Sequence, residues 1–410
     1  MPKLRSLFNS GAMLVVFQVI GLAIPLLTLP FVARMLGVAE FGKVMLAQAI
    51  VFFGVVFVDA GFNTESQRRV ALAKDAAQNI QTLFENLYAR SVCAVPVALL
   101  LAGFSFLFNE VPQTYVVVAM LHILGTLMFP QWWLIGNGMG LQLGLASTVG
   151  RLVAAGLTLA LVRSPEDGLL AVAAASSGTL WAGLLVAPAI RARWKAAGNP
   201  IERRSWRAYF NVVRPTIVSG FFSSASASTP AVILGWFAGI SQVGFYTAAD
   251  RLTRAAAHLL GVIEQSLMGT LARAEEQDTT QARALRRQLM AVLGGVTAVG
   301  CLVVGYAAVD VVHLIFGDKF APVAFLLQLF CLWLWLFTMR RAGLLFTWSL
   351  RGELVYVSRF QWIETVCVTL FVALGAYWAA AVGAVAGLIA CEFVLGLGLW
   401  VALRKTRRPA

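Results

Sequence analysis

The stretch LGVAEFGKVMLAQAIVFFGVVFVDAGFN, Leu36 to Asn63, decides the fold class of this chain. It opens with a polar turn that contains two glycines, continues as a long apolar run, and ends at Asp59 before a second glycine turn. A related turn and helix start returns as AGISQVGFYTAAD at residues 238–250. The spacing is 202 residues for both glycine pairs, Gly37 with Gly239 and Gly42 with Gly244. A repeat at constant spacing predicts a duplicated membrane protein, an architecture common among transporters.

The composition of the whole chain supports a membrane protein. Of its 410 residues, 60% are hydrophobic and 12% are charged, and the mean hydropathy is +0.80. Ordinary soluble domains carry about 25% charged residues. Apolar runs of about 20 residues, long enough to cross a bilayer, recur along the chain and leave no room for a sizeable soluble domain. The first run, residues 11–33, is too long for a signal peptide and has no cleavage pattern after it.

We therefore predict an all-α polytopic membrane protein with two six-helix lobes related by a parallel internal repeat. The N-terminal lobe with its basic linker covers residues 1–205, and the C-terminal lobe covers residues 206–410. A substrate path between the two lobes is expected. The twelve predicted spans are residues 10–35, 40–63, 84–108, 114–136, 140–162, 168–190, 210–237, 242–268, 288–316, 320–345, 356–378 and 381–403.

The net charge of +13 is explained by topology rather than by nucleic acid, which is not an expected partner. With the N-terminus in the cytoplasm, 25 of the 32 Lys and Arg residues fall on the cytoplasmic side and four on the other. This split predicts that both termini are cytoplasmic. The basic loop at residues 191–207 is interpreted as a topology anchor, with binding of anionic lipid headgroups as the alternative.

Motifs for enzymatic chemistry are missing from the sequence. There is no GxxxxGK[ST] loop, no HExxH and no GxSxG, and the three histidines are far apart. The five cysteines lie in apolar runs without a CxxC pair and are interpreted as small core residues. We expect neither an enzyme nor an ATP-driven pump, and no cofactor or metal.

Charged residues within spans are costly and mark candidate functional sites. At about 100° per residue, four polar residues of the eighth span fall on one side of the helix: Thr247, Arg251, Arg254 and His258. Two guanidiniums on one face suit a phosphate, because Arg offers paired donors. The alternative is that they snorkel to the interface or are neutralised by internal acids, and Asp250 is placed to pair with Arg254 at i,i+4.

Other polar residues within spans carry two readings each. Arg151 joins the same basic surface or snorkels, and Gln18 and Gln48 bind a sugar or join helices. Asp59 either forms an ion pair with a nearby arginine, Arg68 or Arg69, or acts as a gate. FPQWWLIG at residues 129–136 is an interfacial aromatic belt or a sugar-stacking surface. The candidates for a gate or for ion coupling are Asp59, Asp250, Glu264, Glu364 and Glu392.

LGVAEFGKVMLAQ followed by DAGFNTESQRRVA resembles the opening of bacterial O-antigen and polysaccharide-unit flippases, the Wzx-type members of the polysaccharide transporter family. That family belongs to a superfamily with the multidrug/toxin extruders and the lipid II flippase. The specific match is residues 36–71, with support from PQWW at residues 130–133. The family often continues the second motif with Gln-Gly and an acid. Here Ile135, Gly136 and Gly138 stand instead, so no role is carried over to those positions.

The resemblance implies a flippase of the bacterial inner membrane that moves an undecaprenyl-pyrophosphate-linked oligosaccharide to the periplasmic leaflet by alternating access. Since no ATP motif is present, an ion gradient or removal of product is expected to drive it. Expected partners are the lipid-linked oligosaccharide, membrane lipids, and a polysaccharide polymerase with its chain-length regulator. Three alternatives remain: a cation-coupled multidrug exporter, a membrane glycosyltransferase of the polymerase or ligase type, and a lipid II flippase.

Overall fold

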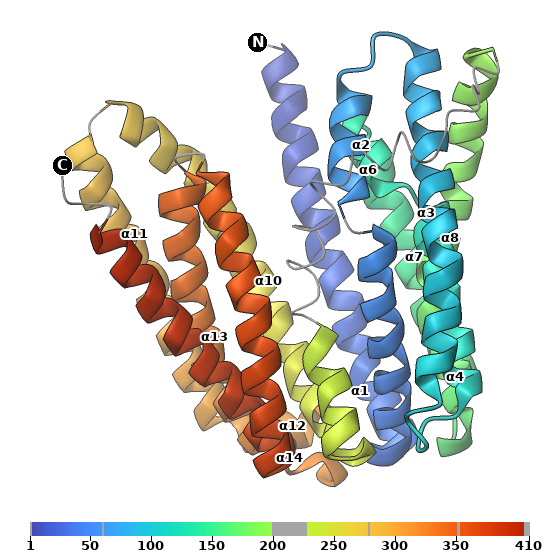
Figure 1. The fold of residues 1–410 in the computed structure, drawn as a ribbon, viewed down its shortest axis with the longest axis vertical. Coiled ribbons are helices and arrows are strands. Elements are labelled where there is room, and N and C mark those ends of the chain that lie inside the picture. Colours follow the sequence, from blue (N-terminus) through green and yellow to red (C-terminus); the bar gives the residue numbers. More distant parts are fainter. Residues whose placement is uncertain (1, 60, 199–227, 278, 351–352, 406–410) are drawn as a thin grey trace. The chain divides into compact units, whose positions relative to one another are not determined.

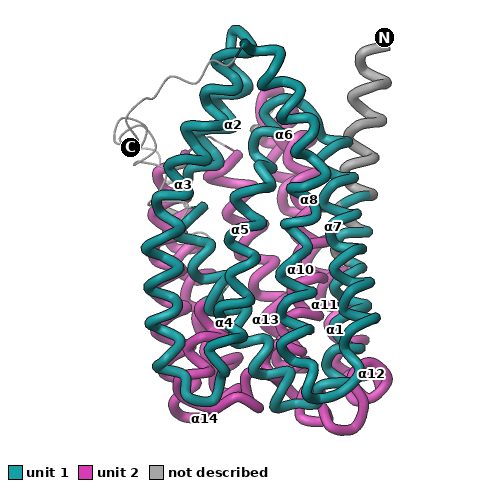
Figure 2. The backbone as a smooth tube through the Cα atoms, turned by 90° about the vertical axis from the view of Figure 1, so that its right-hand side faces the viewer, with its two compact units in different colours: residues 1–228 teal, residues 229–410 magenta. Residues whose placement is uncertain are grey.

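The computed structural model describes residues 2–59, 61–198, 228–277, 279–350 and 353–405, and every regular element within these ranges is helical (Figure 1). The chain forms two compact units, Met1–Ser228 and Thr229–Ala410 (Figure 2). The boundary predicted between residues 205 and 206 falls in 199–227, outside the described residues, and stays a prediction.

Unit 1 is built from helices that follow one another through short turns. Two of the predicted spans are the two halves of one long element, α1, which is broken at Gly37. The fourth predicted span is three short helices, which are separated at Met120 and again at Phe129 and Pro130. The elements are α1 (Pro2–Asp59), α2 (Phe62–Ala71), α3 (Ala76–Ser105), α4 (Gln113–Ala119), α5 (Leu121–Met128), α6 (Gln131–Gly136), α7 (Gly140–Leu161), η1 (Pro165–Asp167) and α8 (Gly168–Ala196).

Unit 2 has the same style of construction. A short apolar helix, Ser228–Phe237, precedes α10. The last element, α14, contains two predicted spans that meet at the irregular residues Ala379 and Ala380. A π-helical turn, η3, extends α13. The elements are α10 (Ile240–Gln277), α11 (Thr279–Tyr306), α12 (Ala308–Phe316), η2 (Asp318–Phe320), α13 (Val323–Leu344), η3 (Leu345–Ser349) and α14 (Leu354–Lys405).

The internal repeat is visible in the backbone of the two units. Gly37 has a φ of 73°, and Gly239, its counterpart 202 residues later, has a φ of 80°. Only glycine adopts this left-handed conformation at little cost. The same glycine therefore makes the same turn before the second span of each half, as the repeat predicts.

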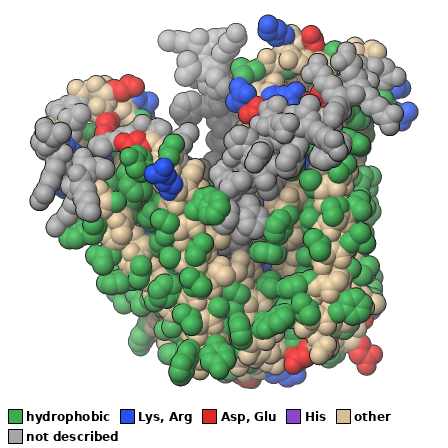
Figure 3. All heavy atoms as spheres, viewed as in Figure 1, with side chains coloured by type: hydrophobic (Ala, Val, Ile, Leu, Met, Phe, Trp, Pro, Cys, Tyr) green, Lys and Arg blue, Asp and Glu red, His purple; other side chains and the backbone are tan. Residues whose placement is uncertain are grey.

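The described helices agree with a multi-pass membrane protein. Eight are long and apolar enough to cross a bilayer, and two of these, in α1 and α14, contain a break between two predicted spans. α10 is not among the eight; it is long but carries several charged residues. The predicted seventh span, 210–237, lies outside the described residues except for 228–237. Hydrophobic side chains cover the helical sides of each unit on the visible face, and charged side chains lie near the helix ends (Figure 3).

The two halves of α14 form a tightly packed antiparallel hairpin. A Cβ on Gly383 would lie 1.9 Å from the carbonyl oxygen of Gly375, and one on Gly387 would lie 2.2 Å from that of Phe371. These distances leave no room for any side chain. The GxxxG spacing of Gly383 and Gly387 therefore lets the backbones touch, as small residues do between membrane helices.

We expect Gly383→Ala to lower the free energy of unfolding by about 1–3 kcal/mol, because the added methyl group would collide with backbone that cannot rotate away. The matched control is Gly396→Ala in the same helix, where an added Cβ meets no atom within 4 Å. That change is expected to be neutral or to stabilise by about 0.5–1 kcal/mol, since it restricts the unfolded chain. Thermal unfolding of both purified variants in detergent measures the difference. Equal stabilities would contradict the packing described above.

Candidate functional site

α10 places the predicted polar residues of the eighth span at three levels of exposure. Thr247 and Asp250 are buried, Arg251 and Arg254 are half-buried, and His258 is exposed. The Thr247 hydroxyl has no hydrogen-bond partner among the described residues. His258, three turns from Thr247 along the helix, is the exposed member of the set, and a binding face shared by the four residues stays a prediction.

Arg254 is held in place by an acid and by an aromatic ring. Its Nε–H donates to both carboxylate oxygens of Asp250 at 2.8 Å, so the predicted i,i+4 pair is present. The guanidinium lies over the Trp333 ring of α13, 5.6 Å from its centre. A cation over an aromatic face is electrostatically favourable. Arg254 is thus partly neutralised and oriented within unit 2, whereas no ion pair of Arg251 is found among the described residues.

Trp333 connects this arrangement to two further arginines of α13. Its ring stacks on Phe337 with centres 4.9 Å apart. Arg340 and Arg341 lie over the Phe337 ring, 5.5 and 5.4 Å from its centre. Three guanidiniums therefore contact one stacked aromatic pair, which links the polar part of α10 to the buried charges of α13 and α14.

Arg340 joins two of the predicted ion-coupling acids in one cluster, the Arg340 triad of Arg340, Glu364 and Glu392. Its Nη2 donates to Glu364 at 2.6 Å and its Nε to Glu392 at 2.5 Å. Additional bonds run from Nη1 to Glu364 at 3.3 Å and from Nη2 to Glu392 at 3.2 Å. The side chains of Arg340 and Glu392 are each 3% exposed, and that of Glu364 is 18% exposed. Every carboxylate oxygen in the triad accepts a bond from the same arginine.

The remaining predicted acids also have arginine partners. Glu264 of α10 is buried and accepts from Arg341 Nε at 2.7 Å. Asp59, at the end of α1, is paired with Arg90 of α3, which also donates to the Thr126 carbonyl oxygen at 3.1 Å. The partner of Asp59 is therefore not Arg68 or Arg69, as the sequence suggested. Those arginines pair instead with nearby glutamates.

The neighbouring pair Glu65 and Arg68 lies outside the membrane-spanning helices. Arg68 donates to both oxygens of Glu65, one turn earlier in α2, at 2.7 and 3.0 Å. This hydrogen bonding lowers the pKa of Glu65. Arg69 points to α3 and pairs with Glu85 at 2.9 Å. The Glu-Ser-Gln-Arg-Arg segment thus forms one ion pair within α2 and one between α2 and α3. Both of its arginines are paired with glutamates.

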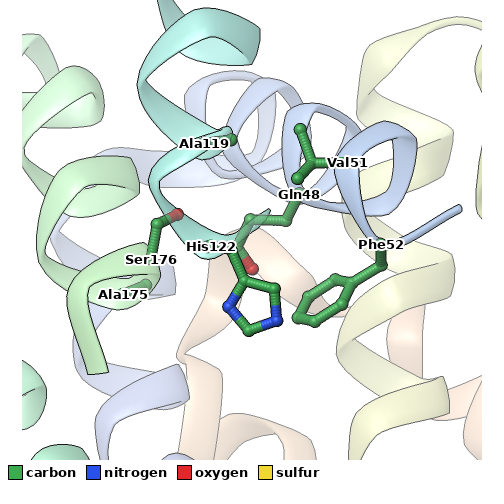
Figure 4. A pocket seen from close by; sticks show the side chains of 7 residues that line it. All are labelled: Gln48, Val51, Phe52, Ala119, His122, Ala175 and Ser176. Atoms are coloured by element: carbon green, nitrogen blue, oxygen red, sulfur yellow. The ribbon is translucent and has the colours of Figure 1, made fainter. Parts of the chain in front are cut away.

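Gln48 lines a small cavity inside unit 1. Figure 4 shows the His122 ring pointing into this space beside Phe52, with Gln48 and the Ser176 hydroxyl next to it. The His122 and Phe52 rings meet edge to face, with centres 4.6 Å apart. The cavity volume is about 30 Å³, far below the range of about 300–1,000 Å³ common for ligand sites. This cavity is too small for an oligosaccharide and therefore gives no support to sugar binding by Gln48. Sugar binding by Gln48 stays a prediction.

The two other predicted binding residues of unit 1 have different outcomes. The side chain of Gln18 lies outside the described residues. Arg151 of α7 lies against α1, because a Cβ built on Gly21 would be 1.8 Å from its Nη1. Gly21 therefore provides the space that this guanidinium occupies. A surface shared by Arg151 and Arg251, which belong to different units, stays a prediction.

The tryptophans of the FPQWW segment form core rather than a membrane-interface belt. Trp132 is 3% exposed and Trp133 is fully buried, within an apolar cluster that includes Val70, Ile80 and Leu83. Trp133 Nε1 donates to Asn79 Oδ1 at 2.8 Å. A ring covered in this way can neither anchor at the headgroups nor stack on a sugar, so both sequence interpretations are wrong. The segment instead fixes α6 against α2 and α3.

Buried arginines are the residues that sequence reasoning missed. Arg90 and Arg340, at 1% and 5% exposure, were counted as cytoplasmic charges but lie within helices. The sequence holds a signal for them, since Arg90 is followed by an apolar run and Arg340 closes one. Glu40, in the LGVAEFGK turn, was also missed: it accepts from the Tyr115 hydroxyl and pairs with Lys43 at 2.9 Å. The cysteines, expected as unpaired core residues, are all free, and two of them are buried.

Over the described residues, the fold is that of an all-helical, multi-pass membrane protein. A model of the family described as "Polysaccharide biosynthesis protein" matches residues 7–275, from α1 to α10. The chain belongs to this family. It is 28% identical over 269 residues to a protein of Escherichia coli (strain K12) called "Putative O-antigen transporter", and the match covers 64% of each chain. The match thus spans slightly under two thirds of that relative.

Solved structures show the same fold at low sequence identity. The lipid II flippase MurJ, described in an inward closed conformation, matches with a TM-score of 0.75 at 9% identity, over 96% of this chain and 87% of its own. An inward-facing multidrug resistance MATE family transporter of the MOP superfamily matches with a TM-score of 0.72 at 14% identity, over 94% and 96%. These relatives are transporters and flippases rather than enzymes, which confirms that expectation and disfavours the glycosyltransferase alternative.

We expect Arg340→Ala to destabilise the protein by about 3–5 kcal/mol, because it leaves the buried carboxylate of Glu392 and the half-buried carboxylate of Glu364 without their partner. Arg359→Ala is the matched control, since Arg359 is exposed on the same α14 helix that carries Glu364. That change is expected to stay within about 0.5 kcal/mol. Thermal unfolding and the monodisperse yield after purification provide the measurement. The triad would not be a stabilising centre if both variants behaved alike.

Proposed function

We propose that this protein is a flippase for a polyprenyl-pyrophosphate-linked oligosaccharide, the repeat unit of an O-antigen or exopolysaccharide. The observation that carries the proposal is that the family match extends through α10 to residue 275. It thus includes the half-buried Arg251 and Arg254 and the buried Thr247 hydroxyl. The E. coli relative, whose printed name is that of an O-antigen transporter, supports the same cargo class.

The chemistry of α10 fits an anionic, hydroxyl-rich headgroup. Guanidinium groups bind phosphate oxygens through paired, charge-assisted hydrogen bonds. Arg251 has no ion pair among the described residues, and Arg254 is oriented by Asp250 and Trp333. A pyrophosphate that approached α10 would meet Arg251, for which no ion pair is found among the described residues, and Arg254, which is held in a fixed direction. We assign Arg251 the larger share of headgroup binding and Arg254 a supporting share.

The rest of the transport cycle belongs to this proposal. The cargo moves from the cytoplasmic to the periplasmic leaflet of the inner membrane, both termini are cytoplasmic, and alternating access is driven by an ion gradient. A polysaccharide polymerase and its chain-length regulator act on the product. The burial of Arg90 and Arg340 removes them from the loop charges that set topology, but the remaining excess of Lys and Arg still favours this orientation.

The test is complementation of a bacterial strain that lacks its own O-antigen flippase. Arg251→Ala combined with Arg254→Ala is expected to reduce surface polysaccharide about 10-fold or more, since each charge-assisted hydrogen bond contributes about 1.5–3 kcal/mol. Asp250→Asn with Arg254→Ala removes cation and acid together. This variant separates the loss of the Arg254 cation from the destabilisation that an unpaired, buried Asp250 carboxylate would cause.

Arg273→Ala is the matched control, because Arg273 is exposed near the far end of the same helix. It should support polysaccharide export at the wild-type level. Full export by the Arg251/Arg254 double variant at normal expression would remove the site assignment. If the wild-type chain restored no polysaccharide and instead raised resistance to cationic drugs, the multidrug exporter would replace the flippase as the function.

A further inference from the structure

The Arg340 triad carries an unbalanced charge. Glu364 and Glu392 both bind Arg340, so two carboxylates share one guanidinium. The triad would hold a net charge of −1 with both acids ionised. In the part of the chain that the structure describes, Arg340 is the cation that contacts these two carboxylates. An uncompensated charge inside an apolar helix bundle is costly, so such a group binds a counter-ion or a proton.

The other predicted ion-coupling acids differ from this pair. Asp59 with Arg90, Asp250 with Arg254, and Glu264 with Arg341 each consist of one acid and one arginine. A carboxylate in a one-to-one pair is stabilised in its ionised form by the adjacent guanidinium. Such pairs are neutral as a whole and have no need of a further charge. The imbalance singles out Glu364 and Glu392 among the five candidates.

We propose that Glu364 and Glu392 together bind one exchangeable proton, and that this proton couples transport to the proton gradient. The first half of this statement is independent of the cargo, and the second rests on the proposed function. The proton is taken up from water by one carboxylate, which becomes a neutral carboxylic acid, and it returns to water on release. With the proton bound, one carboxylate remains and balances Arg340.

Groups on α10, α13 and α14 around the triad bear on this state. α13 contributes Arg340 itself, while its neighbour Arg341 is turned to Glu264 of α10. Cys391 of α14 lies near the two carboxylates, and Cys367 lies near Cys391. Phe337 and Phe360 flank the Arg340 guanidinium at 5.5 and 5.6 Å. Apolar rings keep the site poorly solvated, which strengthens the preference for overall neutrality.

The same contacts connect the proton site to the proposed headgroup site. Phe337, beside Arg340, stacks on Trp333, and the Arg254 guanidinium lies over the Trp333 ring. When the proton leaves, the second carboxylate competes for the Arg340 donors, and the position of Arg340 over Phe337 is the contact that changes. The stack gives a physical route by which the protonation state of the triad biases Arg254.

Infrared spectroscopy of the purified full-length protein in lipid nanodiscs tests for the proton. A protonated carboxyl has a C=O stretch that an ionised carboxylate lacks. A jump in pH on the wild-type protein should reveal one such band that titrates reversibly. Glu364→Gln and Glu392→Gln should each remove it. Glu264→Gln is the matched control, because it removes an acid from a balanced pair in the same unit, and it should leave the band in place.

Three results would overturn the proton site. These are a wild-type protein with no titrating carboxyl band while it stays folded, a band that survives in both the Glu364 and Glu392 variants, and a band that disappears when sodium is added at constant pH. The last result would identify the occupant as a metal cation. Because the wild-type experiment needs no variant, a Gln variant that failed to fold would not leave the proposal undecided.

Polysaccharide export in the complemented strain tests the coupling. Wild-type export should fall when a protonophore collapses the gradient, whereas Glu364→Gln, fixed in the neutral state, should lose most of that dependence. Unchanged dependence in a variant that lacks the infrared band would refute coupling through the triad. Absence of export by the wild-type chain would refute the flippase function while the spectroscopic result stands on its own.

Discussion

The need to neutralise charge inside apolar helices is the constraint on which this structure depends. An ionised group in hydrocarbon is expensive unless a partner is in contact with it. The chain meets this requirement by joining distant helices: α1 to α3 through Asp59 and Arg90, α10 to α13 through Glu264 and Arg341, and α13 to both halves of α14 through the Arg340 triad. The charges that look most functional in the sequence therefore also hold each unit together.

Much of the fold could be predicted because its signals are local. Apolar length identified the spans, and the 202-residue repeat located the two glycine turns that the structure shows at Gly37 and Gly239. The site was harder, because ion pairs join residues that are far apart in sequence. Asp59 lies close to Arg68 along the chain, yet its partner is Arg90. Hydropathy also could not reveal that Trp132 and Trp133 are enclosed by α2 and α3.

One long-range pairing was within reach of the sequence. A turn near residues 379–380 sets the register of an antiparallel hairpin, and Gly375 then faces Gly383 while Phe371 faces Gly387. Continuing the same register places Glu364 opposite Val394, two residues from Glu392. The acids of the triad are thus a consequence of where one turn falls. Arg340 lies on a different helix, so its contact with the two acids depends on tertiary packing and cannot be predicted from the register of the hairpin.

The glycine contacts in α14 have a mechanical consequence for the two acids it carries. Backbone touches backbone at Gly383 and Gly387, so neither half of the hairpin can slide along the other without a collision. The positions of Glu364 and Glu392 relative to each other are accordingly fixed by the packing of the hairpin. Arg340 lies on the neighbouring helix α13, whose α-helical pitch gives way to the wider η3 turn at Leu345, five residues beyond Arg340. A change in the backbone distance between Arg340 and the two acids therefore requires a movement of α13 relative to α14.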